Sequence, residues 1–425
     1  MPTASTTATR LAAQYRAVRR LTEDIVAPLA PEDHVVQGMP DTSPPKWHLA
    51  HTTWFFEMFV LRPYRSGYRV FAEPYARLFN SYYEGAGPFW PRPRRGLLSR
   101  PTVAEIRSYR AYVDENLLGW LEQDESPPAD VLWLVELGLH HEQQHQELLL
   151  TDILYNFWLN PLGPVFRPRP PEPPGPGVGP AAWVSFLGGL TAVGADRSTA
   201  FVFDNETPRH TVWLEPYRLA RRPVTNGEFL AFVEAGGYRR PEHWLAAGWH
   251  IVQTEGWRAP LYWAERDDGW WEFTLAGWVP LDPARPVAHV SYYEADAFAR
   301  WAGARLPTEA EWEHAVQTGP VTGPARWLDL DRLRPAPAPS DPSGLVQMLG
   351  DVWEWTASPY RPYPGFRPWA GTVGEYNGKF MADQWVLRGG SAFTPPGHVR
   401  PTYRNFFPAS ARWQCAGFRL AQDGA

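Results

Sequence analysis

The chain of 425 residues contains a single cysteine, Cys415, and it has no apolar run as long as the ~18 residues that a membrane helix needs. One cysteine excludes an intrachain disulfide and favours a reducing compartment. The apolar residues around Cys415 favour a buried thiol over a nucleophile. Residues 1–20 lack the apolar segment of a signal peptide. These absences predict a cytoplasmic protein without a membrane segment.

An excess of positive charge is also missing. The net charge is −6, which gives no electrostatic reason to expect a nucleic-acid partner. Aromatic residues, in contrast, are abundant: there are 23 Trp, 18 Tyr and 21 Phe. So many large rings predict irregular, loop-rich packing, with pockets that suit cationic ligands.

The most informative stretch is 138–150, where His141 and His145 stand four residues apart. Leucines flank them and no proline interrupts the run, which predicts a helix. Residues four apart lie one above the other on a helix, so the two imidazoles form half of a metal site. Glu147 lies roughly 200° round the helix from His145, at about 100° per residue. We therefore expect Glu147 to lie outside the ligand set.

A third ligand is predicted on another helix. Residues 43–45, Ser-Pro-Pro, form a helix-start signal. On the helix that follows, Trp47, His51 and Trp54 share a stripe that is apolar apart from the histidine, while His48 lies on a flanking face. His51 is thus expected to point into the same interior as the histidine pair.

Three neutral imidazoles suit zinc, copper, iron or nickel, and the residues alone do not choose among these metals. The alternative is that each histidine is a hydrogen-bonded core residue.

The pattern of elements predicts an α+β multidomain protein. Residues 1–160 read as four helices, the third opened by the capping box Thr102-x-x-Glu105. Residues 161–182 are so rich in proline that we expect an extended connector. In residues 183–425, short strand-like pieces alternate with Gly and Pro turns, and two helices interrupt them.

The second half resembles the formylglycine-generating-enzyme/sulfatase-modifying domain, which has a C-type-lectin-like α+β fold. The matching motifs are RLPTEAEWE at 305–313, GDVWEWT at 350–356, RGGS at 388–391 and GFRL at 417–420. The copper-binding cysteine pair of the formylglycine enzymes has no counterpart here, so their chemistry is not expected. The first half resembles DinB-like four-helix bundles.

Together the two halves resemble the sulfoxide synthases of ergothioneine biosynthesis over nearly the whole chain. The resemblance implies a non-haem Fe(II) held by His51, His141 and His145. It also implies that the enzyme joins a thiol sulfur to C2 of the imidazole of hercynine (N-α-trimethylhistidine). O2 is the co-substrate, and the product is a sulfoxide.

The same resemblance suggests residues around the substrates. Tyr82 and Tyr83 are candidates for proton delivery, and Gln144 for binding the hercynine imidazole. Asn405 is expected against hercynine, beside aromatic rings that suit a trimethylammonium group, of which Phe406 is one. The alternatives are that one tyrosine is a core residue and the other a surface residue, and that the glutamine faces solvent.

The sulfur donor is expected to be free cysteine. One subgroup of the family has an aspartate two residues after the asparagine, where it holds the amino group of γ-glutamylcysteine. This chain has Phe407 there, which is the second ring expected beside the substrate. Arg92 and Arg95 are candidates for holding the donor carboxylate, the alternative being a solvated basic loop.

Related reactions remain open at this point. They pair histidine with cysteine at C5 in ovothiol synthesis, hercynine with a selenosugar in selenoneine synthesis, or hercynine with γ-glutamylcysteine. A zinc-dependent thiol transferase is the alternative of another class.

Overall fold

The computed structural model describes residues 4–123, 127–170, 172, 175, 179, 182–196, 201–339 and 343–424. These form two compact units. The first unit joins residues up to Phe166 with a later segment, Trp369–Tyr376, and the second contains Arg167–Pro368 and Asn377–Ala425. The domain limits predicted at residues 160 and 182 stay predictions.

The predicted proline connector is described only in part, since residues 171, 173, 174, 176–178, 180 and 181 lie outside the described chain. From Arg167 onward its described residues belong to the second unit. The Arg167 amide donates to the Leu275 carbonyl at 3.0 Å, and Glu172 forms ion pairs with Arg285 and Arg334. This part of the segment therefore lies along the second unit.

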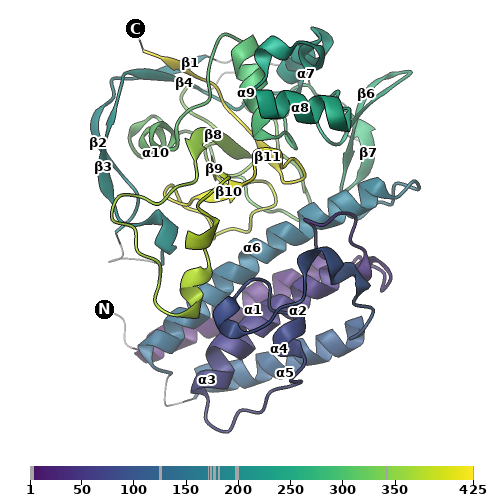
Figure 1. The fold of residues 1–425 in the computed structure, drawn as a ribbon, viewed down its shortest axis with the longest axis vertical. Coiled ribbons are helices and arrows are strands. Elements are labelled where there is room, and N and C mark those ends of the chain that lie inside the picture. Colours follow the sequence, from purple (N-terminus) through teal and green to yellow (C-terminus); the bar gives the residue numbers. More distant parts are fainter. Residues whose placement is uncertain are drawn as a thin grey trace. The chain divides into compact units, whose positions relative to one another are not determined.

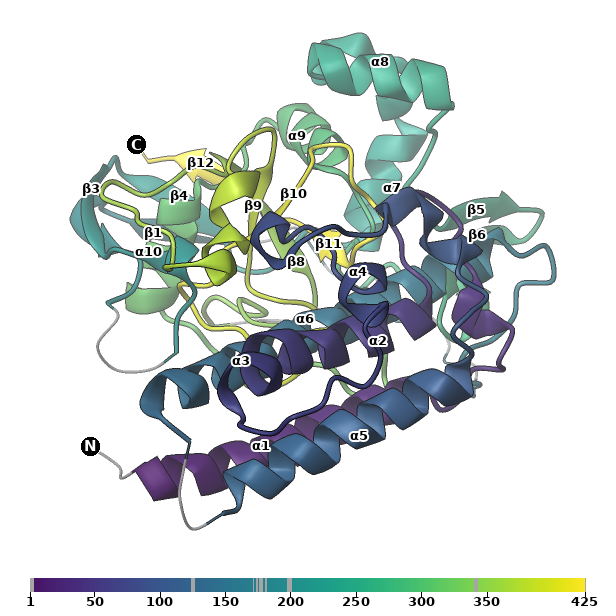
Figure 2. The same ribbon diagram turned by 60° about the horizontal axis from the view of Figure 1, so that its bottom comes forward.

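Four long helices of the described chain form a bundle in the first unit (Figures 1 and 2). They are α1 (Ala4–Val26), α2 (Pro45–Phe56), α5 (Val103–Leu121) and α6 (Ala129–Leu159). Helix α1 packs along α6, and α2 packs along both α5 and α6. A π-helical turn, Glu57–Leu61, extends α2 into the short α3 (Arg62–Tyr64), and α4 (Tyr75–Leu78) follows. The predicted bundle is confirmed, including the capping box at Thr102 and Glu105 that opens α5.

A buried charge cluster ties the bundle together beside the histidines. The carboxylate of Glu142 on α6 accepts hydrogen bonds from Arg19 at 2.9 Å, Thr22 at 2.7 Å and Arg110 at 3.1 Å. Burial alone would raise the pKa of Glu142, but the two guanidinium groups outweigh it and lower the pKa to about 2. Because Glu142 is ionised and fully bonded, it fixes α6 against α1 and α5.

Helices α2 and α6 approach closely at Gly138. A Cβ atom at this position would lie 2.4 Å from the ring of Phe56, the last residue of α2. A larger residue does not fit there unless the helices move apart. The glycine thus permits the spacing at which side chains from α2 and α6 meet.

The second unit combines small sheets with four helices of the described chain. The helices are α7 (Asn226–Glu234), α8 (Ala246–Glu255), α9 (Tyr292–Trp301) and α10 (Glu309–Thr318). The strands are β1 (Trp183–Phe186), β2 (Gly189–Val193), β3 (His210–Leu214), β4 (Tyr217–Ala220), β5 (Trp263–Arg266), β6 (Gly269–Thr274), β7 (Gly277–Pro280), β8 (Trp353–Pro359), β9 (Trp385–Arg388), β10 (Asn405–Phe407), β11 (Ala416–Gly417) and β12 (Ala421–Asp423).

The strands of the second unit form four sheets, with the orders β1-β4-β12, β10-β9-β8-β11, β2-β3 and β5-β6-β7. Only the β8–β11 pair is parallel among the paired strands of the described chain, so the sheet that contains it is mixed. Fully buried Trp312 of α10 packs with Tyr217 and Leu219 in the core. Cys415 is buried, as expected, with its Sγ 3.6 Å from the Asp351 carbonyl oxygen.

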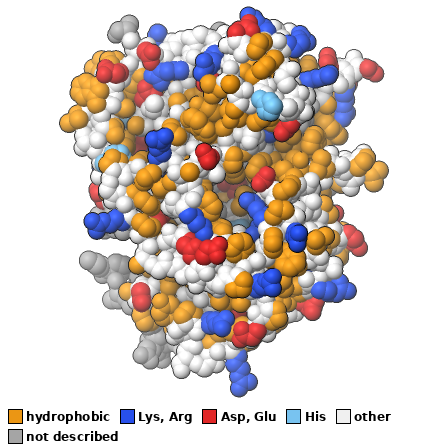
Figure 3. Space-filling model, in the orientation of Figure 1, with side chains coloured by type: hydrophobic (Ala, Val, Ile, Leu, Met, Phe, Trp, Pro, Cys, Tyr) orange, Lys and Arg blue, Asp and Glu red, His pale blue; other side chains and the backbone are white. Residues whose placement is uncertain are grey.

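No helix in the described part of the chain is long and apolar enough to cross a membrane. On the face drawn in Figure 3, acidic and basic side chains are interspersed with hydrophobic ones, and neither sign of charge forms a broad patch.

Candidate metal centre

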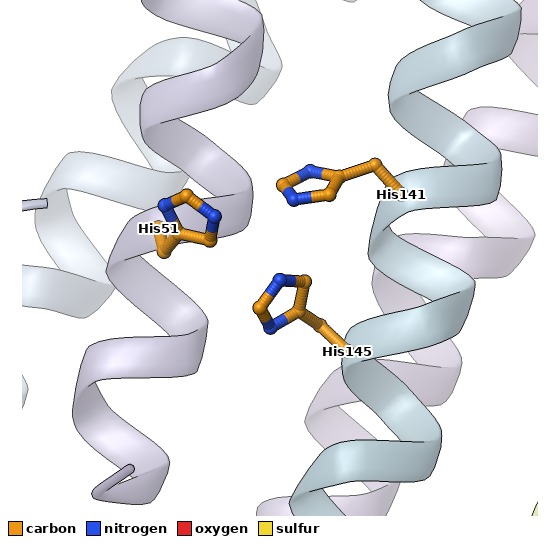
Figure 4. Close-up of side chains that lie close together, drawn as sticks. All are labelled: His51, His141 and His145. Atoms are coloured by element: carbon orange, nitrogen blue, oxygen red, sulfur yellow. The ribbon is translucent and has the colours of Figure 1, made fainter. Parts of the chain in front are cut away.

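Three histidines from two helices converge inside the first unit. His51 lies on α2, and His141 and His145 lie one turn apart on α6. One ring nitrogen from each lies within 4.8 Å of the others, so the three can share one ion (Figure 4). His51 and His141 are almost fully buried. The Glu147 carboxylate is not part of this group among the described residues, and its place outside the ligand set stays a prediction.

The His51 ring is held between two indoles. It stacks on Trp47 at 4.4 Å and on Trp54 at 5.5 Å between ring centroids, with interplanar angles below 20°. Its Nδ1 is 2.5 Å from the Phe79 carbonyl oxygen, which can only accept, so Nδ1 carries the proton. The lone pair of His51 is therefore on Nε2. The predicted stripe of Trp47, His51 and Trp54 is what places this ring.

Burial keeps the three imidazoles neutral. Burial lowers the pKa of His141 to about 3, and it also lowers the pKa values of His51 and His145 well below the ordinary value. Neighbouring imidazoles lower the pKa values of His51 and His145 further. A neutral imidazole has the lone pair that a metal requires. The Nδ1 atom of His141 is buried and has no hydrogen-bond partner among the described residues. The donor set thus fits a transition metal of the kind that imidazole prefers.

Two further buried residues, His48 and Asp152, form a hydrogen-bonded chain that ends at His145. The Nδ1 of His48 is 2.8 Å from the Nδ1 of His145, and its Nε2 is 3.0 Å from Oδ2 of Asp152. The same Oδ2 accepts from the Ser43 amide at 2.8 Å. Sequence reasoning placed His48 on a flanking face and passed over Asp152. The sequence pattern that could have indicated Asp152 is its position seven residues, or about two helical turns, after His145, which places both on the same face of the helix.

The segment Trp369–Tyr376 brings a further tyrosine to the histidines. The Tyr376 hydroxyl donates to Oε1 of Gln144, and its ring centroid lies 5.8 Å from that of His141. Glu375 accepts hydrogen bonds from the amides of Glu84 and Gly85 at 3.0 and 2.8 Å. Sequence reasoning missed Tyr376. The available signal was a polar block bounded by glycines, residues 374–378.

Tyr82 and Tyr83 lie in the loop that Glu375 holds. Their rings stack at 4.6 Å, and Tyr83 also stacks on Trp54 at 5.8 Å. Tyr83 is fully buried and Tyr82 is half-buried. Burial, together with the neighbouring phenols of Tyr82 and Tyr376, raises the pKa of Tyr83 well above the ordinary value. Both predicted tyrosines therefore share a region with Tyr376.

The two predicted arginines differ in environment. Arg95 is buried, lies 3.3 Å over the Trp47 ring, and donates to the hydroxyls of Ser43 and Ser81 at 2.9 Å. These two hydroxyls are neutral, and the Nε of Arg95 has no hydrogen-bond partner among the described residues. Burial lowers its pKa, as does the charge of Arg92. Arg92 itself is exposed.

The remaining predicted residues lie on β10 in the second unit and are half-buried. Asn405 accepts from the Phe406 amide at 2.9 Å. Phe406 stacks on Tyr360 at 4.1 Å, and Phe407 packs edge-on against Trp413 at 5.7 Å. Their contact with substrate stays a prediction.

Comparison with known proteins agrees with this architecture. The model of the DinB superfamily matches residues 14–149. The model of the sulfatase-modifying factor enzyme 1-like domain matches residues 177–335 and 325–424. The predicted fold class is thereby confirmed.

Two curated relatives match over most of the chain. The hercynine oxygenase of Mycolicibacterium smegmatis is 37% identical over 91% of this chain and 92% of its own length. The hercynine oxygenase of Mycobacterium tuberculosis is 36% identical over 90% of this chain and 92% of its own length. The chain belongs to the hercynine oxygenase family. The predicted assignment to this family of oxidoreductases is confirmed.

More distant matches cover the second half. The formylglycine-generating enzyme of Streptomyces coelicolor is 32% identical over 59% of this chain and 93% of its own length. Among solved structures, PvdO from Pseudomonas aeruginosa aligns with a TM-score of 0.40 and 22% identity, over 57% of this chain and 94% of that one.

Proposed function

We propose that this hercynine oxygenase homologue holds Fe(II) with His51, His141 and His145 and joins L-cysteine to hercynine. This proposal rests mainly on three neutral histidines, two of them buried, whose ring nitrogens lie within 4.8 Å of one another. In the proposed reaction the S–H bond of cysteine and the C2–H bond of hercynine are lost. The sulfur bonds to C2 and takes one oxygen atom of O2, and the other oxygen leaves as water. When bound, the iron supplies sites at which thiolate and O2 meet.

Residues near the triad support the substrate assignment. Arg95 is a buried guanidinium that donates to two neutral hydroxyls and whose Nε has no partner in the described chain, which suits the carboxylate of the sulfur donor. Arg92 stays a second candidate. Gln144, whose amide oxygen accepts from Tyr376, is the proposed contact for the hercynine imidazole. On the second unit we retain Asn405, Phe406 and Phe407 as substrate residues.

The donor is proposed to be free cysteine because Phe407 replaces the aspartate of the subgroup that uses γ-glutamylcysteine. A phenyl ring cannot accept a hydrogen bond from an ammonium group as a carboxylate does. A γ-glutamyl group would therefore lose that contact.

Proton delivery would need an acid near the three histidines. Tyr82 and Tyr83 remain proposed for this role, and we add Tyr376. Its hydroxyl reaches Gln144 and its ring faces His141, so it contacts both a proposed ligand and a proposed substrate residue.

The experiment is a matrix of substrates with protein purified anaerobically and loaded with Fe(II). Histidine or hercynine is combined with cysteine, γ-glutamylcysteine or a selenosugar, and the products are weighed by mass spectrometry. We expect O2 uptake and hercynylcysteine sulfoxide only with hercynine and cysteine. A product from another pair would reassign the substrates. Bound zinc with no O2 uptake would favour a thiol transferase.

A further inference from the structure

His48 and Asp152 form a buried chain behind one proposed ligand and not behind the other two. Both side chains are 2% exposed. His48 lies three residues before His51 on α2, and Asp152 lies seven residues after His145 on α6. The chain is thus built from the same two helices as the metal centre.

The hydrogen bonds fix the protons in this chain. An ionised carboxylate only accepts, so the Nε2 of His48 donates to Asp152. The Nδ1 of a neutral His48 is then an acceptor, and the contact at 2.8 Å requires Nδ1 of His145 to donate. The lone pair of His145 is consequently on Nε2. Asp152 therefore selects, through His48, the nitrogen that His145 offers to a metal.

The other two histidines have weaker support. His51 donates to a neutral carbonyl oxygen, that of Phe79, and Nδ1 of His141 has no partner among the described residues. A carboxylate behind a histidine makes the ring a stronger donor and fixes its orientation. The ligands are therefore unequal, with His145 the one whose basicity is raised.

We propose that His48 and Asp152 are positioning residues that set the tautomer and donor strength of His145 for the metal. This inference rests on the proposed function only in requiring that His145 binds a metal. The competing role is purely structural, since Asp152 also accepts from the Ser43 amide just before α2. The test must therefore separate metal binding from stability.

The chain offers a matched control one helical turn later. Asn156 is buried on α6, and its Oδ1 accepts from the Gly38 amide at 2.8 Å. It tethers the segment before α2 as Asp152 does, and its side-chain hydrogen bonds in the described chain join the backbone of Gly38 and Val36. Asn156→Ala should therefore lower stability and leave metal affinity unchanged.

The experiment measures Co(II) binding to the metal-free full chain by competition with a chelator, together with the visible spectrum of bound Co(II). We expect affinity to fall about tenfold in Asp152→Asn, which keeps size and removes charge. In His48→Leu, which removes the link, we expect about a hundredfold fall and a shifted spectrum. Asn156→Ala should bind within about threefold of wild type, because it does not touch the ligands.

Wild-type affinity and spectrum in both variants, with stability falling as in Asn156→Ala, would reduce the pair to a tether and overturn the inference. The proposed metal site would then still stand. If the wild-type chain itself binds no Co(II), the proposed function fails first, and the inference fails with it. Because no substrate is added, substrate identity does not affect either result.

Discussion

At the scale of single residues, the histidines and tyrosines of the site are distinguished by their hydrogen bonds and ring contacts more than by their distance from one another. The pKa values of His51, His141 and His145 are all lowered, yet their Nδ1 atoms differ: that of His51 meets a carbonyl oxygen, that of His145 meets His48, and that of His141 has no partner among the described residues. Likewise, three phenols gather near the triad, but the described contacts of Tyr376 alone join a proposed ligand and Gln144. The predictions at this scale therefore concern atoms that single substitutions remove.

Replacing Tyr376 by phenylalanine removes the hydroxyl and keeps the ring against His141. We expect kcat to fall by about 10²-fold, the lower range for loss of a general acid, with the metal content unchanged. Steady-state O2 uptake and metal analysis measure the two quantities. Tyr82→Phe and Tyr83→Phe serve as comparisons and should lose less. A larger loss in either of these would assign proton delivery to that tyrosine.

His34 should make stability depend on pH below neutrality. It is buried, and burial, with smaller effects of Arg107 and Lys46, lowers its pKa to about 4. The unfolded chain takes up a proton near pH 6.5 and the folded chain does not, so stability is lost as the pH falls from about 6.5 to 4. This contribution amounts to at most about 3 kcal/mol.

The measurement is chemical denaturation of the metal-free protein across that pH range. His34→Gln should lose less stability than wild type between pH 6.5 and 4. His250→Gln, at an exposed position, should follow the wild-type curve. Equal slopes in all three proteins would show that His34 has the same pKa in the folded and unfolded states and would contradict the prediction.

At the scale of elements, local sequence patterns predicted the helices and the direction of their side chains. The capping box at Thr102 and the spacing of His141 and His145 are local, and both are found as predicted. Periodicity also placed His51 on the inner face. Tertiary packing decides which loop returns to the helices, so the glycine-bounded block around Tyr376 did not by itself indicate that this residue lies beside His141. The link from His48 to Asp152 depends on the register between α2 and α6, which single-helix geometry does not give.

That register depends on Gly138. Gly138→Ala gains about 1 kcal/mol of helix propensity, but its Cβ would meet the fully buried Phe56 ring at 2.4 Å. Overpacking of a core costs about 1–3 kcal/mol, so we expect net destabilisation of about 1 kcal/mol and weaker metal binding. Gly119→Ala on α5 meets nothing within 4 Å and should stabilise by about 0.5–1 kcal/mol. Denaturant midpoints compare the two, and stabilisation by both would mean that α2 and α6 have room to separate.

At the scale of the whole molecule, the division into units does not follow the order of the sequence. The segment Trp369–Tyr376 belongs to the first unit although the second unit surrounds it in the chain. Trp369 packs edge-on against Trp133 at 5.0 Å, and Glu375 binds two amides of the loop after Tyr83. The sequence predicted the folds of two successive domains, but it did not predict that Trp369–Tyr376 belongs to the first unit.

Glu375→Ala should remove the hydrogen bonds between this segment and the amides of Glu84 and Gly85. We expect kcat to fall at least tenfold because Tyr376 loses its fixed position, while the histidines keep their metal. Glu265→Ala, at an exposed position on β5, is the matched control and should retain full activity. Steady-state kcat and metal content, measured for both variants and the wild type, test this prediction. An unchanged kcat in Glu375→Ala would mean that the remaining contacts of the segment suffice.

The placement of Trp369–Tyr376 also has a consequence for synthesis on the ribosome. The bundle helices leave the exit tunnel roughly two hundred residues before this segment, a delay of roughly 10–40 s at ~5–20 residues per second. During that interval the nascent helices can assemble only without their last partner. The bundle is thus translated well before the segment that completes it.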